Sequence, residues 1–208
     1  LKLSLDALAD GARNALPVGT ACAQVGVIIG VLTLTGAATN FVGFIVSIGE
    51  SSIFASLLLT MAACLVLGMG IPTIPNYIIT SSIAAPALLQ LGVPLIVSHM
   101  FVFYFGIMAD LTPPVALAAF AAAPFAGVSG MKIGIQAVRI ALAGFIIPFI
   151  AVYSPALLLQ GGTWIDVTYV TVKALLAIGL WGVAATGYWL APVNWLERLY
   201  VFVAAALL

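Results

Sequence analysis

Long apolar runs, separated by polar or glycine- and proline-containing breaks, make up most of this chain. A helix needs about 20 predominantly apolar residues to cross a bilayer. By this measure, full spans are predicted over 17–38, 132–152 and 167–190. Residues 1–15 mix apolar and charged positions in a pattern that suits an interfacial helix, and residues 195–208 begin a last apolar segment. The pattern predicts an all-α polytopic membrane protein.

Other apolar runs are too short to span and are separated by helix-breaking residues. Residues 41–49 end at a predicted interfacial turn. The runs 53–68 and 73–91 flank a Gly/Pro cluster at 68–73, and the second run stops at a Gly-Val-Pro break at 92–94. Two short arms around such a tip favour a re-entrant hairpin, which enters the membrane and leaves on the same side. One long kinked helix is the alternative.

A second Gly/Pro cluster, at 106–114, interrupts the next apolar stretch. Its flanks, 95–109 and 114–126, are together long enough to span as a broken helix. In hydrocarbon, non-helical backbone survives only where it is buried in protein or lines a cavity. Two such breaks on neighbouring segments are the best indication in a sequence of the substrate and ion site of a secondary transporter.

Composition supports the membrane interpretation and excludes several classes of function. The chain is 64% hydrophobic and 6% charged, with a mean hydropathy of +1.30, whereas soluble domains carry about 25% charged residues. A net charge of zero without a basic stripe excludes a nucleic-acid partner. Cys22 and Cys64 lie in apolar runs and are interpreted as small buried hydrophobes. No zinc pair, nucleophile elbow or phosphate loop is present, so no enzyme activity is expected.

The first cluster contains groups that suit a cation. Gly70 permits backbone shapes that leave carbonyl oxygens pointing inward. Pro72 lacks an amide and frees the carbonyl that it would have bonded. Thr73 adds a hydroxyl at a predicted helix start. Freed carbonyls and a hydroxyl suit a dehydrated hard cation such as sodium, and a tight turn without a ligand role is the alternative.

The second cluster places a helix end opposite a helix start at membrane depth. Gly106 opens the helix, and Pro113 and Pro114 remove two successive amides and constrain Thr112. The helix start can then face an anion and the carbonyl end a cation. Asp110 lies directly in this break, where an acid costs about 2.5–3.5 kcal/mol on insertion scales. It is a candidate to ligate an ion, to carry a proton or to cap the following helix.

Polar residues after the first cluster have two interpretations. Asn76, Tyr77, Ser81 and Ser82 follow it by one and two helical turns, so they either line the cavity or hydrogen-bond between helices. His99 is lone and precedes an aromatic run, which is more typical of a packing donor than of a catalyst.

Lysines and arginines are few and scattered, so the sequence does not predict an orientation in the membrane. Arg139 either pairs with a carboxylate of protein or substrate, or extends to the interface from near the start of its span. Trp181, Tyr188 and Trp189 are expected near one interface.

Several of these motifs resemble a known family. Residues 23–36, rich in glycine and threonine, look like the helix that precedes the hairpin in the large permeases of TRAP transporters. Residues 67–73 with Tyr77, the stretch 99–118 and the later 153–159 resemble the fused permeases of the TAXI branch. The resemblance covers about residues 1–160 well and the remaining spans loosely.

This resemblance implies a function. TRAP transporters are tripartite, sodium-driven importers of organic acids such as C4-dicarboxylates in the inner membrane of bacteria or archaea. A periplasmic substrate-binding protein delivers the substrate to a small four-helix subunit and a large permease, which are sometimes fused. The large permease has an elevator-type fold with inverted repeats, each holding a re-entrant hairpin and a broken helix. No cofactor is expected apart from sodium as the coupling ion.

The resemblance also assigns residues and boundaries. Residues 1–160 would be the second repeat, with the hairpin at about 53–91 and the broken helix at about 95–126; residues 161–208 would be C-terminal transmembrane helices, truncated because both ends of the chain look cut. The implied sodium ligands are Gly70, Pro72, Thr73, Gly106, Asp110, Thr112 and Pro113. The implied substrate contacts are Thr73, Asn76, Thr112 and Pro114.

One departure and two rival functions accompany this assignment. Pro75 and Asn76 stand where the branch usually has small residues, so the second arm of the hairpin is expected to start late. The first rival is an elevator-type dicarboxylate symporter that needs no binding protein. The second is a non-transporting membrane assembly subunit in which the breaks serve packing alone.

Overall fold

The computed structural model describes residues 2–207 and is all-helical, without a sheet in that range. Its α-helices are α1 (Lys2–Leu34), α2 (Ala37–Gly49), α3 (Ile53–Gly68), α4 (Thr73–Ile83), α5 (Ala85–Gln90), α6 (Leu95–Met108), α7 (Leu117–Ala126), α8 (Gly130–Ala141), α9 (Ile147–Tyr153), α10 (Trp164–Thr186) and α11 (Trp195–Leu207). Two 3₁₀ segments, η1 (Leu142–Ile146) and η2 (Pro155–Leu158), flank α9. The expected all-α fold is confirmed.

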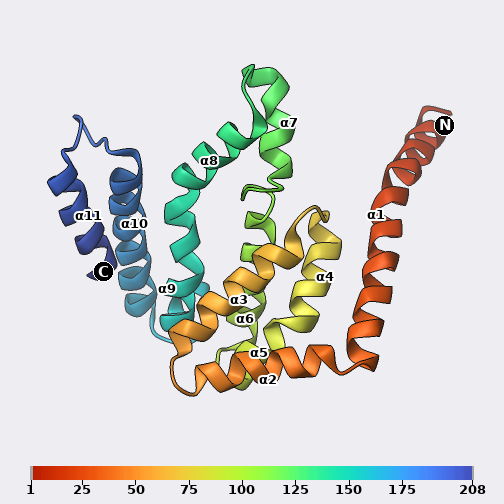
Figure 1. Cartoon of the computed structure of the whole chain (residues 1–208), viewed down its shortest axis with the longest axis horizontal. Helices are drawn as coiled ribbons and strands as arrows, with labels where there is room; N and C mark the ends of the chain where they lie inside the picture. Colours follow the sequence, from red (N-terminus) through yellow and green to blue (C-terminus); the bar gives the residue numbers. More distant parts are fainter. Residues whose placement is uncertain (1, 208) are drawn as a thin grey trace.

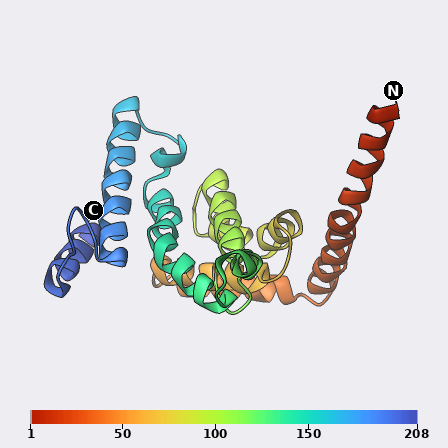
Figure 2. The same ribbon diagram turned by 90° about the horizontal axis from the view of Figure 1, so that it is seen from above.

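The molecule is an open arrangement with α1 at one end and the pair α10–α11 at the other (Figures 1 and 2). Helices α3 to α9 fill the middle, and α2 runs along the lower edge of the molecule in Figure 1. Two helices are long and apolar enough to cross a membrane within the described range, Gly130–Tyr153 and Trp164–Thr186. They correspond to two of the three predicted spans.

The third predicted span, 17–38, has different limits in the structure. A single helix, α1, covers both the expected interfacial segment and most of that span. It ends at Leu34, because Gly36 adopts a left-handed conformation with φ +70° that a helix cannot continue through. The part Gly19–Leu34 and α2 then meet at a bend of 72°, and together they are apolar enough for one broken span.

The hairpin is formed by α3 and α4, which run in opposite directions and are joined by the tip at 69–72 (Figure 1). The late start expected for the second arm is wrong, since α4 begins at Thr73. Pro75 lies in its first turn, where the missing amide has no intrahelical partner to lose. The arm is instead interrupted at Ala84, because the ring of Pro86 prevents a regular helix through the preceding turn.

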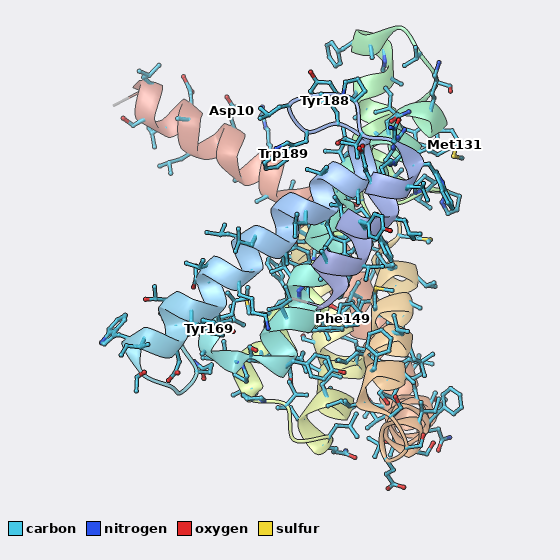
Figure 3. The ribbon with its side chains drawn as sticks, turned by 90° about the vertical axis from the view of Figure 1, so that its left-hand side faces the viewer. Asp10, Met131, Phe149, Tyr169, Tyr188 and Trp189 are labelled. Atoms are coloured by element: carbon cyan, nitrogen blue, oxygen red, sulfur yellow. The ribbon has the colours of Figure 1, made fainter. Side chains whose placement is uncertain are left out.

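Helix α6 lies between the hairpin and α9 and carries the centre of the core. Phe101 and Phe105 are fully buried and pack with Leu57 and Cys64 of α3. Phe149 of α9, labelled in Figure 3, contacts both phenylalanines edge-to-face. Its ring centroid lies 5.4 Å from that of Phe101 and 5.8 Å from that of Phe105. This packing holds the hairpin and the first half of the broken helix in one unit.

Pro148 changes the type of helix in the turn that precedes it. The backbone switches to the 3₁₀ segment η1 directly before α9. Gly144, four residues before Pro148, belongs to η1, and its carbonyl is the one that a proline ring displaces. The span Gly130–Tyr153 is therefore long enough to cross the membrane but is not one regular helix.

Candidate functional site

The hairpin tip is a short non-helical turn at the end of α3. Gly70 has φ +76°, a conformation that favours glycine, and the Ile71 amide donates to the Gly68 carbonyl at 3.4 Å. Pro72 is extended, with ψ 153°, and immediately precedes α4. Gly70, Pro72 and Thr73 are exposed. The tip therefore presents backbone groups and one hydroxyl at the start of a helix.

The second break replaces helix by a chain of tight turns from Ala109 to Ala116. Four successive amides in this region, beginning with that of Ala109, bond carbonyls three residues earlier, and the Thr112 hydroxyl donates to the Met108 carbonyl at 2.7 Å. The Asp110 carbonyl accepts from the Ala118 amide at 3.1 Å across the break. Because Pro113 and Pro114 have no amide to offer, α7 starts only at Leu117.

The two breaks touch each other through backbone. A Cβ added to Gly68 would lie 2.7 Å from the Gly106 carbonyl oxygen and 2.9 Å from the Ala109 Cβ. On the other side of the tip, a Cβ on Gly70 would lie 3.8 Å from Val115. Only glycine at position 68 allows α3 to approach the end of α6 this closely. The two clusters that the sequence singled out therefore form one junction.

Asn76 joins α4 to this junction. Its Nδ2 donates to the Gly106 carbonyl at 2.7 Å, and the residue is 1% exposed. Of the two interpretations offered for this residue, hydrogen bonding between helices is the one observed. Its side chain thus lies inside the packed unit, whereas Thr73 and Pro114, with which it was grouped as a substrate contact, are exposed.

Two buried oxygens at the junction have no hydrogen-bond partner among the described residues, Oδ1 of Asn76 and Oδ1 of Asp110. A buried acceptor left without a donor or cation costs about 1–3 kcal/mol. The same region supplies backbone carbonyls and the Thr112 hydroxyl. An oxygen-only set of this kind suits a hard cation better than a transition metal.

The chain that carries this junction is similar in sequence to one family of membrane transport proteins. The family model of the DctM component of the tripartite ATP-independent periplasmic transporters matches residues 1–163. The chain belongs to the DctM family. No curated protein and no solved structure matches it.

Membership assigns this DctM chain to a family of transporter permeases, membrane proteins that as a family work with a binding protein and a small subunit. The matched range contains the hairpin, the junction and the span up to α9, so the site described above lies within the family's own region. Helices α10 and α11 lie beyond the match.

Other polar residues that the sequence singled out in this DctM chain fix helices to one another or bond within their own helix. The Tyr77 hydroxyl hydrogen-bonds to Nδ1 of His99 at 2.8 Å, and the Tyr77 ring packs edge-on against Phe103. These contacts join α4 to α6. Ser81 and Ser82 donate to the Ile78 carbonyl within their own helix.

Gly68 was not predicted to be the point where α3 closely approaches α6. It lies inside the first cluster, but its partner Gly106 lies 38 positions further along the chain. A glycine near the end of each of two short apolar helices is the only signal that could have suggested the contact, and it does not by itself pair the two.

Proposed function

We propose that this permease imports an organic acid together with sodium and receives the substrate from a periplasmic binding protein. The observation that carries the proposal is the junction of two helix breaks with two unpartnered buried oxygens. Broken helices meeting at membrane depth are the usual setting of ion and substrate sites in secondary transporters. The resemblance to the TAXI branch and to large permeases of the inner membrane supports the same function.

Sodium is placed by this proposal at the junction. The residues that would hold it supply carbonyls near Gly70 and Gly106, hydroxyls of Thr73 and Thr112, and the carboxylate of Asp110. Pro72 and Pro113 contribute by freeing carbonyls that a helix would otherwise use. The Asn76 Oδ1 atom extends the earlier ligand set, because it is buried beside Gly106 and lacks a donor.

The substrate carboxylate is placed at the exposed side of the same junction. Helix α4 begins at Thr73 and α7 begins at Leu117, after Pro114, and helix starts carry partial positive charge. A bound cation would offset the charge of the anion where the dielectric constant is low. The proposal includes an elevator mechanism, in which the hairpin and the broken helix would cross the membrane as one block. This block spans about residues 53–126, within the repeat at 1–160.

Uptake into proteoliposomes tests the proposal. The full-length protein, with its small subunit, is reconstituted and supplied with radiolabelled C4-dicarboxylates or monocarboxylates under an inward sodium gradient, with and without the binding protein. Uptake that needs both sodium and the binding protein is the expected result. Uptake without the binding protein would favour the symporter alternative, and no uptake of any acid would favour the assembly-subunit alternative.

A further inference from the structure

Two arginines from distant parts of the chain meet at the C-terminal end of α10. Arg139 of α8 donates through Nε to the Ala185 carbonyl at 2.8 Å. Arg198 of α11 donates through Nε and Nη2 to the Ala184 carbonyl at 3.0 and 2.7 Å, and through Nη2 to Ala185 at 3.2 Å. The alternative in which Arg139 pairs with a carboxylate of the chain is not seen among the described side chains, where the single ion pair is Arg13–Asp10.

The positive charge at this point exceeds what a helix end requires. The C-terminus of a helix carries about half a negative charge, whereas two guanidinium groups carry two positive charges. The nearby carboxylate of Glu197 accepts from the Asn194 amide at the start of its own helix. Among the described residues, the terminal nitrogens of Arg139 and Nη1 of Arg198 donate to no protein acceptor.

A third donor without an acceptor lies one turn away. The Trp181 ring packs on Phe202 of α11 with centroids 4.5 Å apart, and its buried Nε1 has no hydrogen-bond partner among the described residues. Indole nitrogen can only donate. Two guanidinium groups that form no ion pair with a described carboxylate, together with a buried indole donor, make this end of α10 suited to an anion.

The surroundings indicate which kind of anion fits. Arg198 borders a pocket of about 370 Å³ whose other lining residues are apolar: Ala184, Trp195, Leu199 and Phe202. Tyr188 and Trp189 are exposed on the loop that follows α10, at this same end (Figure 3). Aromatic side chains gather at membrane interfaces. A charged head at the interface with an apolar pocket beside it matches a lipid better than a soluble ion.

The distribution of basic residues indicates the leaflet. Arg13, in the first half of α1, and Lys132, at the start of α8, lie toward the same end of the molecule as the start of α11 (Figure 1). Acidic residues lie at both ends: Asp6, Asp10 and Glu197 at this one, Glu50 and Asp166 at the opposite one. Basic residues concentrate on the cytoplasmic side of membrane proteins, so the proposal below assigns this end to the cytoplasmic leaflet.

We propose that Arg139 and Arg198 form a binding site for the phosphate of an anionic phospholipid of the cytoplasmic leaflet, with an acyl chain along the pocket beside α10 and α11. The site ties the C-terminal helices, which lie beyond the DctM match, to the membrane surface. Basic pockets between membrane helices bind anionic lipid heads in this way. The inference is independent of sodium coupling and of the transported substrate.

Native mass spectrometry of the full-length protein in detergent tests the site. The protein is titrated with phosphatidylglycerol or with phosphatidylcholine, and bound lipids are counted for the wild type, Arg139→Gln and Arg139→Gln/Arg198→Gln. Lys132→Gln is the matched control, because it removes one exposed charge at the same end of the molecule. Arg198→Gln also removes three hydrogen bonds at a helix end, so circular dichroism checks the double variant.

Phosphatidylglycerol is expected to bind in preference to phosphatidylcholine and to bind about fivefold more weakly for each arginine removed, the usual effect of one basic residue beside an anionic surface. Lys132→Gln is expected to bind as the wild type does. Equal binding by Arg139→Gln and the wild type would overturn the proposal. Displacement of the bound lipid by millimolar inorganic phosphate would indicate that the site takes a soluble anion, and would overturn the proposal. Arginine variants that bind lipid as the wild type does but lose the small subunit would indicate that the partner is a protein carboxylate, and would also overturn it.

Discussion

The two polar regions of this molecule are opposite in kind. At the junction of the helix breaks, the unpaired buried atoms are acceptors, Oδ1 of Asn76 and Oδ1 of Asp110. At the end of α10 the unpaired buried atom is a donor, Nε1 of Trp181, near the guanidinium groups of Arg139 and Arg198. An acceptor surplus suits a cation and a donor surplus suits an anion. The two regions are therefore proposed to bind ions of opposite charge.

The two regions also differ in how close their helices come. At the junction the end of α3 approaches α6 closely through Gly68, whereas α10 and α11 are joined by the long side chain of Arg198 and by the aromatic pair Trp181–Phe202. Substitutions at the junction are therefore expected to change both the stability of the protein and its sodium-dependent uptake.

The largest effect is expected from Gly68→Val. Its Cβ would lie 2.7 Å from the Gly106 carbonyl oxygen, so α3 and α6 must separate, at a cost of about 3 kcal/mol for an overpacked contact. Thermal unfolding in detergent should show a lower Tm, and uptake should be lost. Gly179→Val is the matched control, since nothing lies within 4 Å of its added Cβ. Equal behaviour of the two variants would show that the close approach is unimportant.

The next effect is expected from Asn76→Ala. It removes the bond to the Gly106 carbonyl and should lower the free energy of unfolding by about 1–3 kcal/mol, because a buried polar group loses its partner. Chemical denaturation measures the change. Asn40→Ala, at an exposed position of α2, should change stability little. If Asn76→Ala retains full stability and full sodium affinity, the residue neither fastens the junction nor contacts the ion.

A smaller and purely functional effect is expected from Thr112→Ala. If the hydroxyl oxygen contacts sodium, its loss should raise the sodium concentration for half-maximal uptake by about tenfold, which is typical of a hydrogen bond or contact to a charged group. Thr35→Ala is the control, because Thr35 makes the same bond to a carbonyl four residues earlier, at 2.8 Å, but at the end of α1. An unchanged sodium dependence would remove Thr112 from the site.

The smallest effect is expected from Tyr77→Phe. The variant keeps the ring contact with Phe103 and loses only the bond to His99, so stability should fall by about 1 kcal/mol. The loss of stability is compared with that of Tyr153→Phe, in which an exposed tyrosine loses its hydroxyl, so that the difference gives the contribution of the Tyr77 hydroxyl. A loss no larger than that of the control would mean that the Tyr77–His99 bond does not hold α4 on α6.

The positions of glycine and proline in the sequence predicted much of the fold. The limits of α3 agree with the predicted 53–68, because glycine and proline at 68–73 end a helix whatever surrounds it. The limits of α1 were less predictable. Gly36 is followed by two alanines, which are good helix formers, and only the structure shows that it adopts a left-handed conformation at the turn into α2.

The candidate site was predicted as two separate clusters and not as one junction. Gly68 and Gly106 carry no side chain whose chemistry could pair them, and their contact depends on how α3 packs against α6. For the same reason the partner of Arg139 could not be found in advance. It is a backbone carbonyl of Ala185, and every residue has one. Long-range contacts to the backbone leave little trace in a single sequence.

The glycine contact at the junction also constrains how the protein can evolve. Any side chain at position 68 would push two helices apart, so that position has almost no neutral alternatives. Thr73 and Pro114 are exposed near the same junction and can change without disturbing the contact. Natural variants with a new preference for substrate are therefore expected to differ at these exposed positions and to inherit the glycine unchanged.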